Sequence, residues 1–483
     1  MTLHIGLDLG TSGVKAVLLR DLTTVVAEAA HPLSISRPQL GWSEQDPDDW
    51  VAAVLACLDD LAAKAPDDVA QVRGIGLSGQ MLAALILDGD LRPIRPAMLW
   101  NDQRAQAECA TLLARMPDIG QRSNGTPDPG ITAAKLLWLA SHEPRAMDRA
   151  RMLLLTKDYV RLVLTAEIAT EASDAGGTQL LDCRLGVWDE GMCAAAGWDI
   201  AHLPPLVDSW AAAGQLRQKF LARWGMVGPV VVAAGAGDNM GSTLGAGGTR
   251  PGNAVLTLGT SGVSCIVDAE FHPGPDRAIL TSAHVVASAF LSMGVVMSAT
   301  ASLDWVAGMT GQDPSALNAT AEAFVAENQI ARAPHFLPCL TGVRTPLNRP
   351  DLLGRMSGLH PGVTPGALAY ATMEGVAFQL ADCLAAQAAV GVAARSVTLV
   401  GGGSRSRLWS RLIATALQMP VNLAARSDIA GPLGAARLAA VAAGAGTGIL
   451  EFSVADMDRI DPDAALHSAL QDRRAGFDAL SKG

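Results

Sequence analysis

The chain lacks any surplus of positive charge. Its 483 residues include 36 Lys and Arg against 47 Asp and Glu, which gives a formal net charge of -11 at pH 7. Proteins that bind nucleic acids or anionic membranes neutralise phosphates with Lys and Arg. The composition therefore predicts neither partner, and an anionic ligand has to be met locally, by backbone amides.

Cysteine is also scarce. The seven cysteines are odd in number, widely spaced and form no C-x-x-C pair, so they indicate neither a disulfide framework nor a zinc site. The nine histidines form no H-x-x-x-H pair. We expect reduced thiols, a cytoplasmic location and no transition metal.

Targeting and membrane signals are missing as well. No basic stretch followed by an apolar one opens the sequence, so we expect no signal peptide. Residues 278–303 contain no Asp, Glu, Lys or Arg and have the length of a membrane span. They hold His284, Gly294 and seven Ser or Thr, which predicts instead a buried pair of strands that runs into a helix.

An internal repeat is the most informative feature that is present. The six residues 9–14, Leu-Gly-Thr-Ser-Gly-Val, recur without change at 258–263. Each copy follows an alternating apolar run and precedes another β-rich run, so each predicts a hairpin. Elsewhere strands alternate with helical stripes, which indicates an α/β fold. We expect two similar α/β domains, 1–243 and 244–483, with a hinge in the glycine-rich residues 241–252.

The first copy of the repeat is a candidate phosphate site. Gly10 and Gly13 let the backbone approach a phosphate, while turn amides and the hydroxyls of Thr11 and Ser12 supply donors. Asp8 lies on the opposite strand face from the apolar residues and could meet a solvated Mg²⁺. The alternative is an ordinary tight hairpin, but duplication favours two turns that hold one polyphosphate. In the second copy Thr257 replaces the aspartate.

Two further glycine-rich junctions follow predicted strands. Asp238 comes just after the apolar strand 230–234 and between glycines, where it could accept a proton from an alcohol; its alternative role is a helix N-cap. Residues 401–404, Gly-Gly-Gly-Ser, follow another strand and open a helix. Bare backbone at a helix N-terminus suits an adenine, ribose or phosphate, although a plain turn is the alternative.

Residues 74–79 fit the G-x-G-x-x-G pattern of dinucleotide sites. The segment that follows predicts a strand and turn, whereas the dinucleotide motif requires a helix, so we reject that interpretation. Gln80 and the triplet Trp100-Asn101-Asp102 suit a hydroxyl-rich ligand better, with amide and carboxylate groups for hydroxyls and an indole for the C–H face of a sugar. The alternative is a turn with a half-buried Trp.

Taken together, these segments resemble the FGGY carbohydrate kinases, and among them the xylulokinases. The resemblance covers nearly the whole chain in the same order. Its motifs are 8–15, 78–81, 100–102, 129–132, 157–159, 173–175, 237–239, 258–262, 336–338, 344–346, 374–376, 401–404 and 431–436. Each motif is weak alone, and the ordered set is specific.

The resemblance implies a fold, an activity and a set of site residues. The fold would be two ribonuclease-H-like domains, as in actin and hexokinase, on either side of a catalytic cleft. ATP, with Mg²⁺ at Asp8, would phosphorylate a primary hydroxyl of a pentulose, most directly O5 of D-xylulose, with Asp238 as the catalytic base. The sugar contacts would be Gln80, Met81, Trp100, Asn101, Asp102 and Asn239. The nucleotide contacts would be Gly10, Thr11, Ser12, Lys15, Gly259, Thr260, Ser261, Gly401, Gly402, Gly403 and Ser404.

Two positions depart from the xylulokinase pattern. Leu82, followed by Ala83, stands where His and Gly are usual, and Val343 replaces a Glu before Arg-Thr-Pro. Because the His is missing, the sequence leaves an alternative phosphoryl acceptor open, either another ketose such as ribulose or a sugar alcohol. A rival of another class is an actin-like or chaperone-like ATPase without a sugar substrate, which needs no sugar contacts. The sequence leaves the oligomeric state open, and a homodimer is one outcome that it allows.

Overall fold

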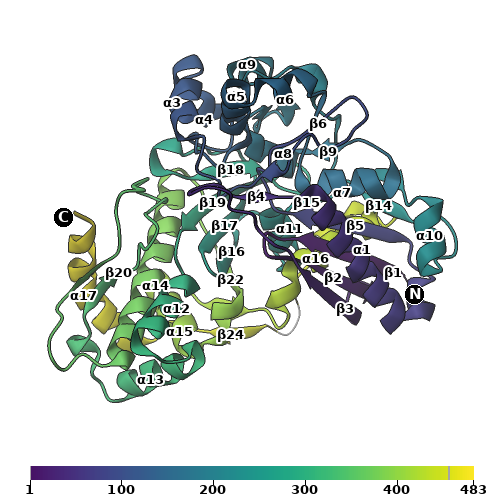
Figure 1. Ribbon diagram of the computed structural model, residues 1–483. Coiled ribbons are helices and arrows are strands. Elements are labelled where there is room, and N and C mark those ends of the chain that lie inside the picture. The colour runs from purple at the N-terminus through teal and green to yellow at the C-terminus, as the bar shows by residue number, and fades with distance from the viewer. Residues whose placement is uncertain (1, 455–456, 483) are drawn as a thin grey trace.

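The computed structural model describes residues 2–454 and 457–482, and in this part of the chain two seven-stranded sheets lie side by side (Figure 1). The first sheet has the order β13-β14-β5-β1-β2-β3, with β15 also paired to β5. Its strands are β1 (Leu3–Leu9), β2 (Gly13–Arg20), β3 (Thr24–Pro32), β5 (Gly74–Gly79), β13 (Ala212–Gln215), β14 (Val231–Ala233) and β15 (Ala236–Gly237).

The second sheet has the order β18-β19-β17-β16-β22-β23-β24. Its strands are β16 (Asn253–Leu258), β17 (Gly262–Asp268), β18 (Leu280–Ala283), β19 (Phe290–Val296), β22 (Ser396–Val400), β23 (Val421–Leu423) and β24 (Asp458–Ile460). Both sheets place a hairpin beside a parallel strand, because β1 pairs antiparallel with β2 and parallel with β5, and β16 does the same with β17 and β22.

Helices cover the sheets and build a separate layer at the edge of the first domain (Figure 1). In the first half they include α1 (Pro47–Lys64), α3 (Gln106–Arg115), α5 (Thr132–His142), α7 (Thr156–Thr165), α8 (Ala172–Ala175), α10 (Gln218–Trp224) and α11 (Asp238–Gly245). In the second half they include α12 (Thr300–Thr310), α13 (Pro314–Ala326), α14 (Pro365–Ala389), α15 (Arg407–Leu417), α16 (Ala430–Ala442) and α17 (Ala464–Lys482).

The structure confirms both predicted hairpins and the interpretation of the uncharged segment. Leu9 pairs with Val14 in the first hairpin, and Leu258 pairs with Gly262 in the second. Residues 278–303 form β18, β19 and the start of α12, as expected for two strands and a helix. In the described residues no helix is both long and apolar enough to cross a membrane. All seven cysteines are buried and free.

Two helices that are far apart in the sequence, α11 and α16, pack together between the sheets (Figure 1). Their backbones nearly touch, since a Cβ on Gly434 would lie 2.0 Å from the carbonyl oxygen of Gly241, and one on Gly245 would lie 1.9 Å from that of Ala430. Helix α16 also lies against β1 and β5 of the first sheet. The chain therefore returns to the first domain at α16.

This crossing corrects part of the predicted hinge. Residues 241–245 belong to α11 and are not a linker. Gly245 is required by the close approach of α16, while a Cβ on Gly241 would lie 2.8 Å from the side chain of Ser78 in β5. Only the short segment between α11 and β16 remains irregular. The domain boundary at 243/244 stays a prediction, and it falls in the last turn of α11. An apolar cluster around Met240, Leu244, Val255 and Leu438 joins the two sheets at this point.

Candidate active site

The predicted catalytic residues meet at one edge of the first sheet. Strands β1, β5 and β15 run parallel, so their carboxyl ends lie at the same edge. The register places Asp8 opposite Ser78, and Gly79 opposite both Leu9 and Gly237. The phosphate turn, the Gln80 segment and Asp238 therefore follow adjacent strands, which is where open α/β sheets bind ligands.

Asp238 is the first residue of α11 and does not cap it. Gly237 occupies the N-cap position, without a side-chain cap. The Asp238 Oδ1 atom accepts hydrogen bonds from the backbone N–H of Asn239 at 2.7 Å and from the amide of the same residue at 3.1 Å. The side chain is half-buried. Burial, and after it the charge of Asp8, raises the pKa of Asp238 to about 7, which suits a general base near neutral pH.

Asp8 faces the same edge from the end of β1. The hydroxyl of Ser78 donates to its Oδ1 at 2.8 Å, and burial raises the pKa of Asp8 against the opposing effects of Ser78 and Lys15. A Cβ on Gly431 would lie 2.7 Å from its Oδ2, so α16 begins directly against the carboxylate. Carboxylate oxygens are the ligands that Mg²⁺ prefers, so Asp8 with the neighbouring Asp238 fits that ion.

The first phosphate turn is held from below by a chain of amides. Gln45 Nε2 donates to the carbonyl of Thr11 at 2.8 Å, and Gln80 Nε2 donates to Gln45 Oε1 at 2.7 Å. The indole of Trp100 donates to Thr11 Oγ1 at 2.9 Å. Lys15 takes no part in this hydrogen-bond network, because its Nζ donates to the carbonyl of Asp428 at 2.8 Å. Gly10, Thr11, Ser12 and Gly13 remain at least partly exposed.

The second domain repeats the arrangement with β16 and β22. These strands are parallel and in register at Thr257 and Val400, so Gly259, Thr260 and Ser261 lie at the same edge as the glycine segment 401–404. The Thr260 carbonyl accepts from the N–H of Ala299 at 2.8 Å. Thr260 is exposed, and Gly259 and Ser261 are partly exposed. The Gly259 N–H donates within the turn to the Ser261 carbonyl at 3.1 Å, so the amides of Thr260 and Ser261 are the candidate phosphate donors.

The glycine run has a partly structural explanation. A Cβ on Gly401, whose φ is +93°, would lie 2.7 Å from the Leu258 carbonyl oxygen, and one on Gly403 would lie 2.5 Å from the Leu258 side chain. Gly402 meets nothing within 4 Å and is exposed. The hydroxyl of Ser404 donates to the Gly401 carbonyl at 2.7 Å. Gly402 is therefore the member of the run with surface left for a ligand.

The predicted sugar contacts differ in accessibility. Met81 is buried against Gly237, where a Cβ would lie 2.8 Å from its sulfur. Trp100 is 39% exposed. Asn101 is partly buried, and its buried Oδ1 atom has no hydrogen-bond partner among the described residues. The Oε1 of Gln80 is likewise unpartnered.

Asp102 is the exception among these residues. It is fully buried, and its carboxylate accepts from the N–H of Ser43 at 2.7 Å and from Arg104 at 2.9 and 2.6 Å. A carboxylate so fully bonded holds the Trp100 loop in place. Its role as a direct sugar ligand stays a prediction, and these contacts speak against it.

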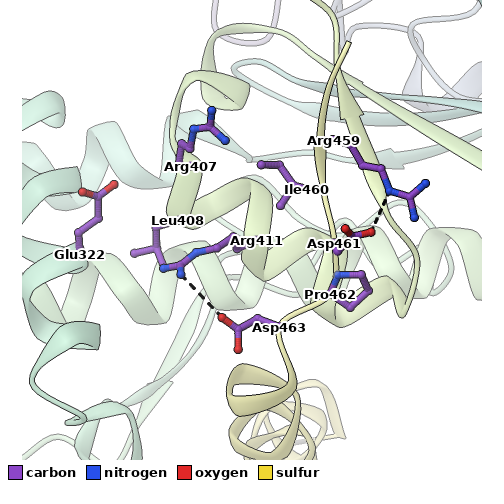
Figure 2. Close-up of a pocket in the computed structure, with 9 residues that line it drawn as sticks. All are labelled: Glu322, Arg407, Leu408, Arg411, Arg459, Ile460, Asp461, Pro462 and Asp463. Carbon is purple, nitrogen blue, oxygen red and sulfur yellow. Dashed lines mark hydrogen bonds and ion pairs between the residues drawn. The ribbon is translucent and has the colours of Figure 1, made fainter.

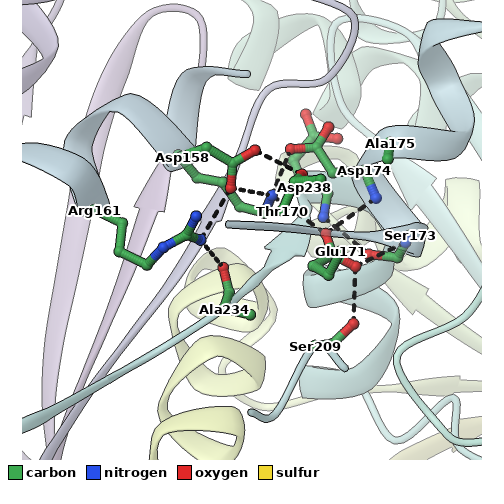
Figure 3. Close-up of polar contacts among 12 residues, drawn as sticks. Asp158, Arg161, Thr170, Glu171, Ser173, Asp174, Ala175, Ser209, Ala234 and Asp238 are labelled. Atoms are coloured by element: carbon green, nitrogen blue, oxygen red, sulfur yellow. Dashed lines mark hydrogen bonds and ion pairs between the residues drawn. The ribbon is translucent and has the colours of Figure 1, made fainter. Parts of the chain in front are cut away.

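A group of buried charges went unnoticed in the residue-by-residue analysis. Lys157, Asp158, Arg161, Glu171 and Asp174 are fully buried and joined by ion pairs (Figure 3). Two of their segments appeared only as motifs of the resemblance. The sequence signal that could have revealed them is the presence of Lys157, Asp158 and Arg161 within the otherwise largely apolar residues 153–164. Charged side chains are rarely buried without partners.

A cavity of about 550 Å³ lies elsewhere, on the second domain between α15 and β24 (Figure 2). None of the predicted site residues lines it. Its arginines are already paired, Arg411 with Asp463 at 3.7 Å and Arg459 with Asp461 at 2.9 Å. We assign it no ligand. No cluster of three or more metal-ligating side chains occurs among residues 2–454 and 457–482.

Comparison with known proteins shows that the chain matches one protein family over most of its length. Residues 3–245 match the model of the N-terminal domain, and residues 254–443 that of the C-terminal domain, of the FGGY family of carbohydrate kinases. The chain is 38% identical to the xylulose kinase of Escherichia coli K12, over 99% of this chain and 98% of that one. It is 39% identical to the xylulose kinase of Klebsiella pneumoniae, over 91% and 90%. The crystal structure of a xyloylose kinase from Brucella ovis superposes with a TM-score of 0.92 at 38% identity, over 99% and 98% of the two chains.

Proposed function

The chain belongs to the FGGY family of carbohydrate kinases, and from this premise we propose that it transfers the γ-phosphate of ATP to O5 of D-xylulose. Kinases of this family use ATP, and relatives that match nearly the whole chain are xylulose kinases. The observation that carries the proposal is the placement of Asp238 beside Asp8 and the first phosphate turn, at the carboxyl ends of adjacent parallel strands.

Asp238 is the base in this account. Phosphoryl transfer needs an acceptor hydroxyl that is held in line with the γ-phosphate and a carboxylate that takes its proton. Burial raises the pKa of Asp238 to about 7, which suits a carboxylate that takes up a proton near neutral pH. The hydrogen bonds from Asn239 fix one carboxylate oxygen, which leaves the other for the sugar.

The phosphates would be held by the two turns. The amides near Thr11 and Thr260 are accessible donors, and such donors stabilise charge that develops on a transferring group. Asp8 would hold Mg²⁺ directly or through water, and the ion supplies charge neutralisation at the phosphate oxygens. Gly402 would face the adenosine, while Gln80, Trp100 and Asn101 would contact the sugar. Closure of the domains would keep water from the γ-phosphate. The cytoplasm is the compartment that we propose, in keeping with seven free, buried thiols.

A second acceptor is favoured by one observation. Leu82 is half-buried at the end of the Gln80 segment, where an apolar side chain cannot donate to a hydroxyl. Another ketose, such as ribulose, or a pentitol is therefore the alternative substrate.

An acceptor panel tests the proposal. ADP release is measured by a coupled assay with D-xylulose, D-ribulose, hexuloses and pentitols, and without any sugar. We expect the highest kcat/KM with D-xylulose and negligible release without sugar. A higher kcat/KM with a pentitol would identify the pentitol as the substrate in place of D-xylulose. ADP release that is independent of sugar would indicate the ATPase alternative.

A further inference from the structure

The buried charges behind Asp238 have no place in the mechanism above. We call Lys157, Asp158, Arg161, Glu171 and Asp174 the buried ion cluster. Lys157 Nζ lies 3.0 Å from Asp158 Oδ1, 3.0 Å from Asp174 Oδ2 and 3.3 Å from Glu171 Oε1. All five side chains are fully buried. Burial of ion pairs seldom stabilises a fold more than apolar side chains of similar volume would. Stability alone therefore does not explain this cluster, and its contacts with neighbouring segments matter more.

Two hydrogen bonds connect the cluster, directly through Arg161 or indirectly through Ser173, to residues 234–237. Arg161 donates to the carbonyl of Ala234 at 2.7 Å. Ser173, whose N–H is held by Glu171 at 2.7 Å, accepts at its Oγ from the N–H of Gly237 at 3.2 Å. Asp238 follows Gly237 in the sequence. Figure 3 shows the Asp238 side chain beside the cluster.

Glu171 and Lys157 secure the same segment by two other routes. Ser209 donates its hydroxyl to Glu171 at 2.8 Å, and its carbonyl accepts from the N–H of Gly235 at 2.9 Å. The stem of Lys157 passes between Gly79 and Gly235, since a Cβ on either glycine would lie 3.3 Å or 3.1 Å from it. One buried group thus touches both the Gln80 strand and the Asp238 strand.

We propose that the buried ion cluster is a positioning device for phosphoryl transfer, which fixes the main chain before Asp238 through Ser173 and Arg161. This inference rests on the proposed role of Asp238. The residues of the cluster touch neither substrate in this account. They act by holding the carboxylate where a hydroxyl can reach it, and a shift of about 1 Å at such a group costs about 100-fold in rate.

Ser173→Ala tests the proposal, because it removes one hydrogen bond to Gly237 and no charge. We expect kcat for sugar-dependent ADP release to fall about 10-fold, with the KM values for ATP and sugar and the thermal midpoint nearly unchanged. Ser123→Ala is the matched control, since this buried hydroxyl bonds only the Ile119 carbonyl, at 2.7 Å, and should leave kcat unaltered.

Ser173→Cys provides the second variant, with an acceptor of similar size, and should restore part of kcat. If Ser173→Ala does not fold, a kcat of Ser173→Cys between zero and the wild-type value carries the test. Wild-type kcat in Ser173→Ala, or equal losses in both alanine variants, would overturn the proposal. An inactive wild type would instead point to failure of the proposed function.

Discussion

The hydroxyl of Ser78 donates a hydrogen bond of 2.8 Å to Asp8 Oδ1, across the parallel pair β1 and β5. This bond favours the ionised carboxylate, in opposition to burial, which raises the pKa of Asp8. It would therefore favour the form of Asp8 that binds a cation in the proposed mechanism.

Asp8→Asn should raise the Mg²⁺ concentration for half-maximal activity and lower kcat by about 100-fold, because the amide has no charge to offer the ion. Ser78→Ala should show the same trend on a smaller scale, since it removes only the supporting hydrogen bond. A Mg²⁺ titration of ADP release measures both. An unchanged Mg²⁺ requirement in Asp8→Asn would remove Asp8 from the metal site.

The pH dependence should follow Asp238. Its pKa of about 7 predicts that kcat/KM for the sugar falls about tenfold per pH unit well below pH 7 and levels off above it, because the base must be ionised to accept a proton. A pH profile of initial rates checks this. An acid limb centred near pH 4 would contradict the raised pKa of Asp238.

The stability of the fold should also depend on the ionisation of Asp238, but it should be favoured by low pH, whereas activity is favoured by high pH. The folded-state pKa of Asp238 lies above the value of about 3.9 that is usual for an unfolded chain, so the folded form binds the proton more tightly. Its favourable contribution is complete below about pH 4 and is lost as the pH rises through about 7. Asp238→Asn should therefore raise Tm relative to wild type more at pH 8 than at pH 5. Equal differences at the two pH values would contradict the raised pKa.

The crossing of α16 over the first sheet makes a prediction about glycine. A Cβ on Gly76 would lie 1.9 Å from the backbone oxygen of Ala435, which cannot move aside as a side chain could. Gly76→Ala should destabilise the protein by about 3 kcal/mol, as measured by denaturant unfolding. Gly308→Ala is the control, because that position in α12 meets nothing within 4 Å and should gain up to about 1 kcal/mol. Similar stability of the two variants would contradict the close crossing.

Leu82 gives a prediction on substrate affinity. Its φ of +70° is a conformation that His adopts more readily than Leu, so Leu82→His should fold. A new donor to a sugar hydroxyl should lower KM for D-xylulose by about 3- to 10-fold with kcat unchanged. Leu82→Ala, which removes the apolar side chain without adding a donor, should not lower KM. If Leu82→His leaves KM unaltered, the residue does not face the sugar.

Local patterns predicted the elements that local chemistry determines. The duplicated hexapeptide gave two hairpins, because both copies carry the same turn residues between alternating strands. The strand 230–234 was predicted nearly at its observed bounds, Val231–Ala233. The repeat also predicted two similar α/β domains, but the ribonuclease-H-like fold came from the resemblance, since no local pattern shows that parallel strands such as β1 and β5 are neighbours.

Contacts over long sequence distances escaped prediction. The glycines at 74 and 76, which match a dinucleotide motif, lie in β5 and leave room for α16, more than 350 residues later in the chain. Asp102 matched a sugar-binding triplet, yet its bonds to Ser43 and Arg104 use both oxygens. Only the folded chain shows which polar side chains are already satisfied.

The most direct test of the account is Asp238→Ala, with sugar-dependent ADP release and ATP binding measured on the same preparation. We predict that turnover falls by about 10²- to 10⁴-fold while the Kd for ATP changes little, because the proposed phosphate donors are the amides of the turns at Thr11 and Thr260 and not this carboxylate. Near-normal turnover in the variant would contradict the assignment of Asp238 as the base.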